Sequence, residues 1–183
     1  MQRSSVAPNA AVSLFGRPDG FLGNDKARIG LPGSLEPAAK ILKFIGQGRR
    51  VDELVTAMNR AAEEAVPQAK GLLVGAIRSL KVEDALQIVR GSDMALTEFF
   101  SHKTREPLRD KFLPIVTRTM SKVKLAERCN DIAGKAASMG LVKGDEANVD
   151  SYVTRHALDG LFLMIAEEEK KIAPTRCKAA ARF

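Results

Sequence analysis

The apolar residues of this chain recur at three- and four-residue spacing over most of its length. Such spacing places side chains on one side of an α-helix. In the clearest case, which begins at Asp52, one helical face carries Leu54, Val55, Met58, Ala61, Ala62 and Ala65. We find no alternating apolar and polar run long enough to predict a strand. The pattern therefore predicts an all-α protein.

The segment Tyr152–Ile172 is predicted to be the central helix, because its middle is apolar on every side and must be enclosed by other helices. Asn148 and Asp150 are candidates for its N-terminal cap. Gly160 lies inside this helix and costs about 1 kcal/mol relative to alanine. We expect close packing against the alanine face of the helix at residues 52–66 to offset that cost.

Further helical stretches are predicted to begin near Leu35, Pro67, Glu83, Ser92, Glu106 and Ala126. The first of these should turn Ile41, Leu42 and Ile45 inward. Pro114 should kink the helix predicted over residues 106–123. Together these stretches predict a bundle of about seven to eight helices.

The chain has 183 residues, of which 45% are hydrophobic, so its length suits one domain with a substantial core. We expect three parts: residues 1–33 as an extended and turn-rich segment packed on the bundle, residues 34–172 as the helical bundle, and residues 173–183 as a basic tail. No stretch approaches the roughly 20 apolar residues that a membrane span needs.

The net charge of the chain is +7, and the positive charge is concentrated in two segments. Residues 170–183 carry five basic side chains and no acidic one. Residues 101–128 carry three acidic side chains and eight basic ones, namely Lys103, Arg105, Arg109, Lys111, Arg118, Lys122, Lys124 and Arg128. Such asymmetry favours an acidic partner, although charge runs are more often only solvated faces.

An acidic protein assembly, such as a microtubule or ciliary lattice, is the partner that we expect for this basic surface. Nucleic acid and an anionic membrane are the alternatives. The basic segment offers Phe112 but no Tyr or Trp for stacking on bases, so contact with nucleic acid would be limited to phosphates.

A pocket between two helices is the alternative functional prediction. Asn59, Arg60 and Glu63 interrupt one apolar helix, while His156 and Asp159 share a face of another. These five side chains could bind a small ligand or serve an unrecognised enzyme.

The same polar residues also have a structural interpretation, which is the more common one. Asn59 would then bond a neighbouring backbone group, Arg60 would pair with Glu64, and Arg155 would pair with Asp159.

The sequence holds none of the common catalytic signatures. It lacks the nucleophile elbow, the phosphate-binding loop and the dinucleotide-binding glycines, and its only histidines are His102 and His156. Cys129 and Cys177 lie far apart and fit no zinc pattern, which favours a reducing compartment, with a single long-range disulfide as the alternative. We therefore expect no catalytic residue, metal or cofactor, and a role other than that of an enzyme.

Several short motifs resemble those of the domain-of-unknown-function family numbered 4197. They are Pro18-Asp-Gly-Phe21, Ile29-Gly-Leu-Pro32, Met58-Asn-Arg-Ala-Ala-Glu-Glu-Ala65, Thr97-Glu-Phe-Phe100, Tyr152-Val-Thr154, Ala157-Leu-Asp-Gly-Leu-Phe162 and Glu168-Glu-Lys-Lys-Ile172. The resemblance covers roughly residues 10–172, with the motifs in the family's order. It implies an all-helical bundle and no particular activity.

The two ends of the chain depart from that family's pattern. Its members are mainly bacterial and usually start with an export signal, whereas here the apolar stretch at residues 10–15 is too short for one. The ending at 173–183 is also shorter than is usual in the family. We therefore expect an intracellular location, cytoplasmic or cytoskeletal, with an organelle as the alternative and the periplasm disfavoured.

Overall fold

The computed structural model describes residues 6–81, 83–84, 86, 88, 91–92, 94–127 and 148–180. Within those residues all regular secondary structure is helical and no strand is present, as the apolar spacing predicts. The longer helices are α1 (Val6–Phe15), α2 (Glu36–Phe44), α3 (Gly48–Ala65), α4 (Ala69–Arg78), α6 (Ala95–Met120) and α8 (Val149–Ala180). Two short 3-10 helices are η2 (Gly33–Leu35) and η3 (Val66–Gln68).

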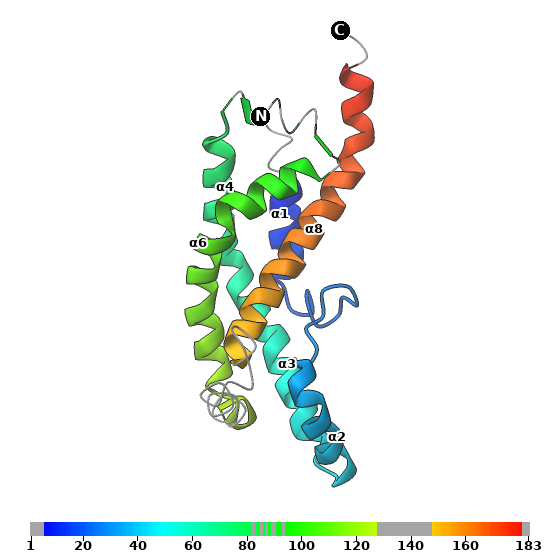
Figure 1. Cartoon of the computed structure of the whole chain (residues 1–183), viewed down its shortest axis with the longest axis vertical. Coiled ribbons are helices and arrows are strands. Elements are labelled where there is room, and N and C mark those ends of the chain that lie inside the picture. Colours follow the sequence, from blue (N-terminus) through cyan, green and yellow to red (C-terminus); the bar gives the residue numbers. More distant parts are fainter. Residues whose placement is uncertain are drawn as a thin grey trace.

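Three long helices form the centre of the molecule. α6 packs along both α8 and α3, and α1 packs against α8. Figure 1 shows α1 behind α8 at one end, while the α2–α3 pair projects at the other. The core between these helices is closed by large side chains that are almost completely buried, among them Phe15, Phe21, Phe100, Phe112, Leu108 and Leu161.

α6 replaces two predicted helices by one helix of 26 residues. The predicted break between the helices starting near Ser92 and Glu106 is wrong, because a continuous buried stripe runs through it. Its members recur every three or four residues and are Leu96, Thr97, Phe100, Thr104, Leu108, Phe112, Val116 and Met120. Pro107 and Pro114 lie inside the helix at exposed positions, and Figure 1 shows the helix changing direction along its length.

The number of described helices, six, is slightly below the predicted seven to eight. The merging of two segments into α6 accounts for part of the difference. In the helix predicted near Glu83, Leu86 is exposed rather than inward, and Val89 lies outside the described residues. The segment predicted from Ala126 also lies outside them from residue 128 onward.

Residues 6–15 of the N-terminal segment form helix α1, whereas the sequence predicted an extended and turn-rich chain there. Ala7, Ala11 and Phe15 of α1 lie four residues apart and are fully buried. They form one apolar helical face, and their four-residue spacing in the sequence is typical of a helix. After α1, residues 16–32 run as a loop over α3 and α8 (Figure 1).

α8 is the predicted central helix and is longer than expected. Asn148 precedes it, and the Asn148 side-chain Oδ1 accepts a hydrogen bond of 2.7 Å from the backbone N–H of Asp150, which satisfies one of the free donors of the first turn. The helix continues to Ala180, through most of the predicted tail. Its middle is buried, except that Leu163 is exposed.

Gly160 packs against the loop rather than against the alanines of α3, so the predicted contact is wrong. A Cβ atom at this position would lie 2.8 Å from Phe21 Cε1 and 3.5 Å from the Cβ atom of Ala27. The absence of a side chain at Gly160 therefore lets the loop approach α8 closely.

α2 exposes apolar side chains that the sequence pattern placed inward. Ile41 and Ile45 are exposed, although the pattern placed them inward, and Leu42 is half-buried. α2 packs mainly on α3 and η2, and the pair extends beyond the other helices (Figure 1). An apolar stripe indicates which side of a helix is suited to burial, but it does not show that another element packs against that side.

Candidate functional site

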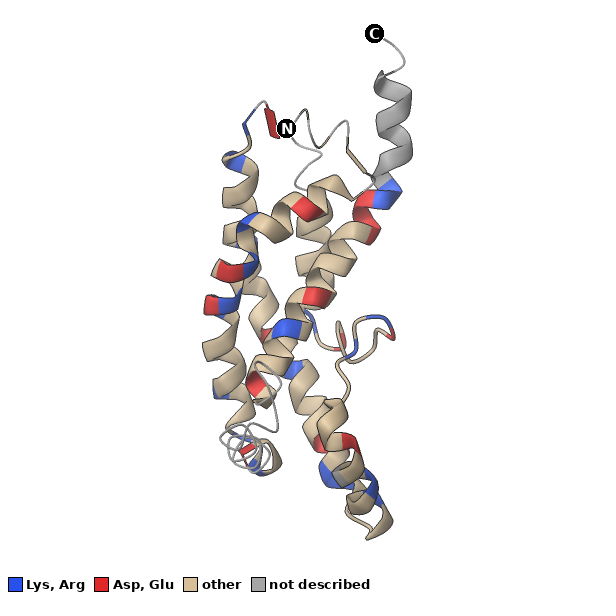
Figure 2. Ribbon diagram, viewed as in Figure 1, with Lys and Arg blue, Asp and Glu red and all other residues tan. Residues whose placement is uncertain are grey.

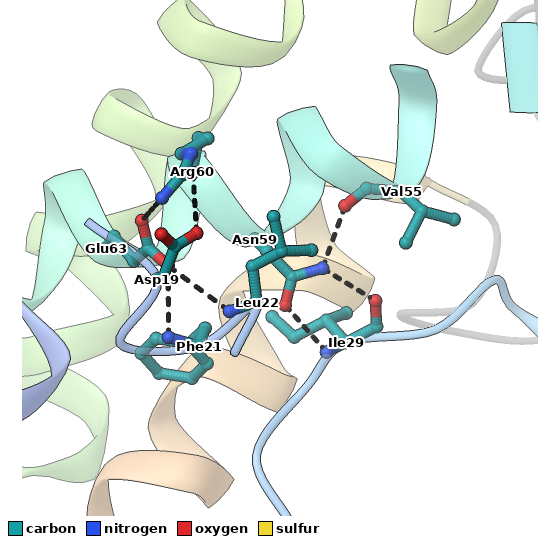
Figure 3. Close-up of polar contacts among 8 residues, drawn as sticks. All are labelled: Asp19, Phe21, Leu22, Ile29, Val55, Asn59, Arg60 and Glu63. Carbon is teal, nitrogen blue, oxygen red and sulfur yellow. Dashed lines mark hydrogen bonds and ion pairs between the residues drawn. The ribbon is translucent and has the colours of Figure 1, made fainter. Parts of the chain in front are cut away.

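Asn59 attaches the loop to α3. Its side chain is fully buried, and its Oδ1 atom accepts a hydrogen bond of 2.9 Å from the Ile29 N–H. Its Nδ2 atom donates to the backbone oxygens of Ile29, at 2.9 Å, and Val55, at 2.8 Å (Figure 3). The structural interpretation of Asn59 is therefore confirmed, because the amide satisfies the N–H and C=O groups of Ile29, which lie outside regular secondary structure.

Glu63 holds the same loop one helical turn further along α3. Its buried Oε1 atom accepts hydrogen bonds from the N–H groups of Phe21, at 3.0 Å, and Leu22, at 3.2 Å. Arg60 donates to the other carboxylate oxygen at 2.6 Å and to Asp19 at 2.7 Å (Figure 3). The hydrogen bonds to Glu63 and then to Asp19 raise the pKa of Arg60.

The predicted pair between Arg60 and Glu64 is wrong. Glu64 points instead to α6, where it accepts hydrogen bonds from Arg118 at 2.8 Å and from the Thr119 hydroxyl at 2.6 Å. The Thr119 hydroxyl, and after it the Arg118 guanidinium, lower the pKa of Glu64.

Glu169 of α8 caps the start of α6, a role that the sequence analysis did not identify. Its carboxylate accepts hydrogen bonds from the N–H groups of Leu96, at 3.0 Å, and Thr97, at 2.9 Å, and from the Thr97 hydroxyl at 2.8 Å. The side chain is almost completely buried. A carboxylate at a helix N-terminus satisfies free donors and interacts favourably with the helix dipole. Here the capping residue comes from a distant part of the chain.

The second half of the predicted pocket has its own partners. Asp159 binds Arg105 of α6, and the His156 ring lies against the Tyr152 ring with a centroid distance of 4.2 Å. Asp159 and Arg105 line a hollow of about 310 Å³ on the surface between α6 and α8. Asn59 and Glu63, by contrast, face the loop. A single pocket that includes these α3 residues together with His156 and Asp159 stays a prediction.

The predicted basic surface is partly neutralised by acidic neighbours. Figure 2 shows Asp and Glu interspersed with Lys and Arg along α6. Arg105 pairs with Asp159, Arg118 pairs with Glu64, and Arg109 lies 3.9 Å from Glu106. Three of the eight predicted partner-binding residues therefore hold the protein's own carboxylates.

The four lysines of the predicted surface differ from these three arginines in how far they lie from acidic side chains. These exposed residues are Lys103, Lys111, Lys122 and Lys124. Within the described part of the chain, no acidic side chain lies within ion-pair distance of them. Arg128, the eighth predicted residue, lies outside the described residues.

Two of these lysines meet a basic residue of another helix. Lys122 and Lys124, just after α6, line a hollow of about 530 Å³ together with Arg50 and Glu53 of α3. Three basic side chains and one acidic side chain thus line one hollow, and the acidic one, Glu53, pairs with Arg49. Arg50 was not among the predicted residues of the basic surface. The consecutive residues Arg49 and Arg50 near the start of α3 could have indicated it.

Neither a metal centre nor a membrane span emerges from the described residues. Within them, no three His, Cys, Asp or Glu side chains lie close enough together to hold a metal ion. No helix among them combines the length and apolar character needed to cross a bilayer.

The comparisons with known proteins agree with the resemblance drawn from the motifs. No curated protein and no solved structure matches the chain. A family model, described as that of a protein of unknown function (DUF4197), matches residues 5–182 and therefore nearly the whole chain. The chain belongs to the DUF4197 family.

Proposed function

We propose that the protein is a non-enzymatic interaction module that docks through a basic surface onto an acidic macromolecular assembly. The observation that carries this proposal is the cluster of Arg50, Lys122 and Lys124, which two separate segments bring to one hollow. Concentrated charge of one sign attracts an oppositely charged partner and speeds its encounter. Lys103 and Lys111 extend the positive charge along the exposed side of α6.

The use of the buried polar groups supports a role other than catalysis. Asn59, Glu63 and Glu169 are three of the buried polar side chains, and each accepts a hydrogen bond from at least one backbone N–H group. A catalytic group needs its reacting atom within reach of a substrate. These three residues stabilise the arrangement of the loop and helices instead.

A protein assembly is favoured over nucleic acid as the acidic partner. Phe112 is the aromatic residue that the basic segment could offer to bases, and its side chain is fully buried on the inner face of α6. Binding of single-stranded nucleic acid gains much of its affinity from stacking on exposed rings. The lysines are left with a purely electrostatic contact, which an acidic protein lattice such as a microtubule can also provide.

Co-sedimentation of the full chain with microtubules, at rising salt concentration, tests this proposal. We expect binding at low salt that weakens as salt screens the charges. The variant Lys122→Glu/Lys124→Glu should bind at least ten-fold more weakly, because it reverses two charges of the cluster.

The matched control is Lys70→Glu/Lys81→Glu, which makes the same change in net charge at two exposed lysines away from the cluster. This control should bind as the wild type does. If wild-type protein binds neither microtubules nor another acidic polymer at low salt, or if both double variants lose binding equally, the proposal is wrong.

A small-ligand site, the alternative function, has weaker support from the geometry. Asn59 already makes three hydrogen bonds, and both carboxylate oxygens of Glu63 are bound. A ligand would have to displace the loop to reach either side chain. Thermal-shift screening with metal ions and small metabolites would reveal such a ligand as a rise in melting temperature.

A further inference from the structure

The turn between α2 and α3 presents the most exposed apolar side chains among the described residues. Phe44 is 92% exposed, Ile41 is 64% exposed and Ile45 is 59% exposed. Single exposed apolar residues are common on protein surfaces, but three adjacent ones at the end of a projecting helix pair indicate a contact surface. We call residues 40–49 the hairpin tip.

The backbone of the hairpin tip is well ordered by its own hydrogen bonds. Gln47 N–H donates to the Leu42 oxygen at 2.7 Å, and Gly46 N–H donates to the Lys43 oxygen at 3.2 Å. Gly46 has a φ of 77°. This is the Schellman arrangement that closes a helix C-terminus, and glycine suits its left-handed residue. The turn therefore presents Phe44 from a helix C-terminus whose last carbonyl groups are hydrogen-bonded.

Positive charge surrounds these apolar side chains. From Pro37 to Val51 the chain contains four basic residues, Lys40, Lys43, Arg49 and Arg50, and no acidic one. Lys40, Lys43 and Arg49 are exposed, and the Arg49 Nε atom lies 2.9 Å from Glu53 in an exposed pair. The tip thus combines an apolar point with flanking positive charge.

We propose that the hairpin tip binds the surface of an anionic phospholipid bilayer. Phe44, Ile41 and Ile45 enter the boundary between headgroups and acyl chains, where apolar side chains leave water. The nearby Lys40 and Lys43 lie at the depth of the lipid phosphates, to which an anionic membrane surface attracts them.

The shape of the tip favours a bilayer over a protein groove. A specific protein interface usually buries at least about 1,000 Å² in total and needs a complementary surface. The tip lies at the end of two packed helices that project from the molecule, and it offers three exposed large apolar side chains (Figure 1). A fluid bilayer accepts such a shape without a preformed groove. Arg50 directly follows the tip and lines the same hollow as Lys122 and Lys124. Phe44 and Lys43 are not among the residues that line that hollow, so either proposal can fail without the other.

Vesicle co-sedimentation with the full chain tests this inference. Wild-type protein should bind vesicles that contain phosphatidylserine and bind far more weakly to vesicles of phosphatidylcholine alone. Phe44→Ser should reduce binding about ten-fold or more, because the transfer of one Phe side chain out of water is lost. Lys43→Glu should reduce binding to the anionic vesicles about ten-fold and affect the neutral vesicles little.

Two controls separate membrane binding from a general effect. Leu163→Ser removes an exposed apolar side chain of α8, and Lys70→Glu reverses an exposed charge of α4; both should bind as the wild type does. Urea unfolding of Phe44→Ser should match that of the wild type, which shows that the variant is folded.

Three outcomes would overturn the proposal. The first is the failure of wild-type protein to bind anionic vesicles. The second is an equal loss of binding in Leu163→Ser and Phe44→Ser. The third is sedimentation of wild-type protein as a dimer that Phe44→Ser converts to a monomer with no change in vesicle binding, which would assign the tip to a second copy of this chain.

Discussion

The two ends of α3 lie in contrasting surroundings. Its C-terminal half packs between α6 and α8, and Ala61, Ala62 and Ala65 there are fully buried. Its first two turns pack chiefly against α2, and they expose Arg49 and Arg50 to solvent. The same helix therefore belongs to the core at one end and to a projecting surface at the other (Figure 1).

The contrast extends to how the two regions use unusual residues. In the core region, polar side chains are buried and bind backbone groups, as Asn59 and Glu63 do for the loop. In the projecting region, the apolar side chain of Phe44 is exposed although no fold requirement places it there. Burying a polar group and exposing a large apolar one are both costly. The first is offset within the molecule by hydrogen bonds, and the second is the observation from which we propose contact with a membrane.

Substitution of one phenylalanine in each region should give the largest difference. Phe112→Ala, in the core, should lower the free energy of unfolding by about 3–5 kcal/mol through lost burial and the resulting cavity. Phe44→Ala, at the hairpin tip, should change it by less than about 0.5 kcal/mol. Urea unfolding followed by circular dichroism measures both values. A cost above about 2 kcal/mol for Phe44→Ala would mean that the tip is part of the core.

Removal of the α6 cap should have the next largest effect. Glu169→Ala leaves two backbone N–H groups and the Thr97 hydroxyl without the carboxylate, and should lower the free energy of unfolding by about 3 kcal/mol. Its neighbour Glu168 forms a surface pair with Lys171, so Glu168→Ala should leave stability nearly unchanged. Equal losses in the two variants, measured by urea unfolding, would contradict the capping role.

Two glycines test the approach of the loop to α8. Gly160→Ala places a methyl group about 2.8 Å from the buried Phe21 ring, and should lower the free energy of unfolding by about 1 kcal/mol even after the gain in helix propensity. Gly71→Ala, in the exposed face of α4, meets no atom within 4 Å and should raise it by about 0.5–1 kcal/mol. Opposite changes in melting temperature are expected, and a rise for both variants would contradict the close packing.

The smallest expected effect concerns pH. Hydrogen bonds from Thr119 and Arg118 lower the pKa of Glu64, and a hydrogen bond from Lys26 lowers the pKa of Glu167, in each case from an ordinary value of 4.5. A carboxylate with a lowered pKa in the folded state stabilises the protein above that ordinary value, and the stabilisation is lost as pH falls through the folded-state pKa.

The stability difference between wild type and Glu64→Gln/Glu167→Gln should therefore be present near pH 7 and should shrink below pH 4.5. Because both carboxylates are partly exposed, the difference should be small. Urea unfolding across this pH range measures it, and a difference that grows toward acid would contradict the assignment.

The sequence predicted the features that depend on periodicity. It identified the all-α class, the apolar face of α3, the central helix α8 and the new helical segment that starts near Pro67, which the structure forms as η3 and α4. Periodicity was less informative where two effects compete. The sequence predicted a break before Glu106, but α6 continues through it as one helix, because its buried stripe outweighs the hydrogen bonds that Pro107 and Pro114 remove.

Long-range polar partners could not be predicted from a single sequence. Glu63 is 42 residues from the Phe21 N–H that it binds, and no local spacing encodes that pairing. Glu169 did carry a signal, because it continues the buried row of Leu158, Leu161 and Ile165 at helical spacing. An acidic residue in such a row needs a buried partner.

The candidate surfaces show the same limit. The run of basic residues was visible, but the structure divides it into arginines bound to the protein's own acids and lysines that are exposed. The apolar side of α2 was visible too, but only the fold shows that nothing in the described chain covers Ile41 and Phe44.

Amide hydrogen exchange tests the contrast between the two regions most directly. The N–H groups of Phe21, Ile29, Leu96 and Thr97 bind buried side chains, and they should exchange only when the whole molecule unfolds. The N–H groups of Gly46 and Gln47 in the hairpin tip should exchange at least a hundred-fold faster, through local opening of α2. Equal protection at both sets of amides would contradict the account, because α2 would then be as firmly held as the bundle.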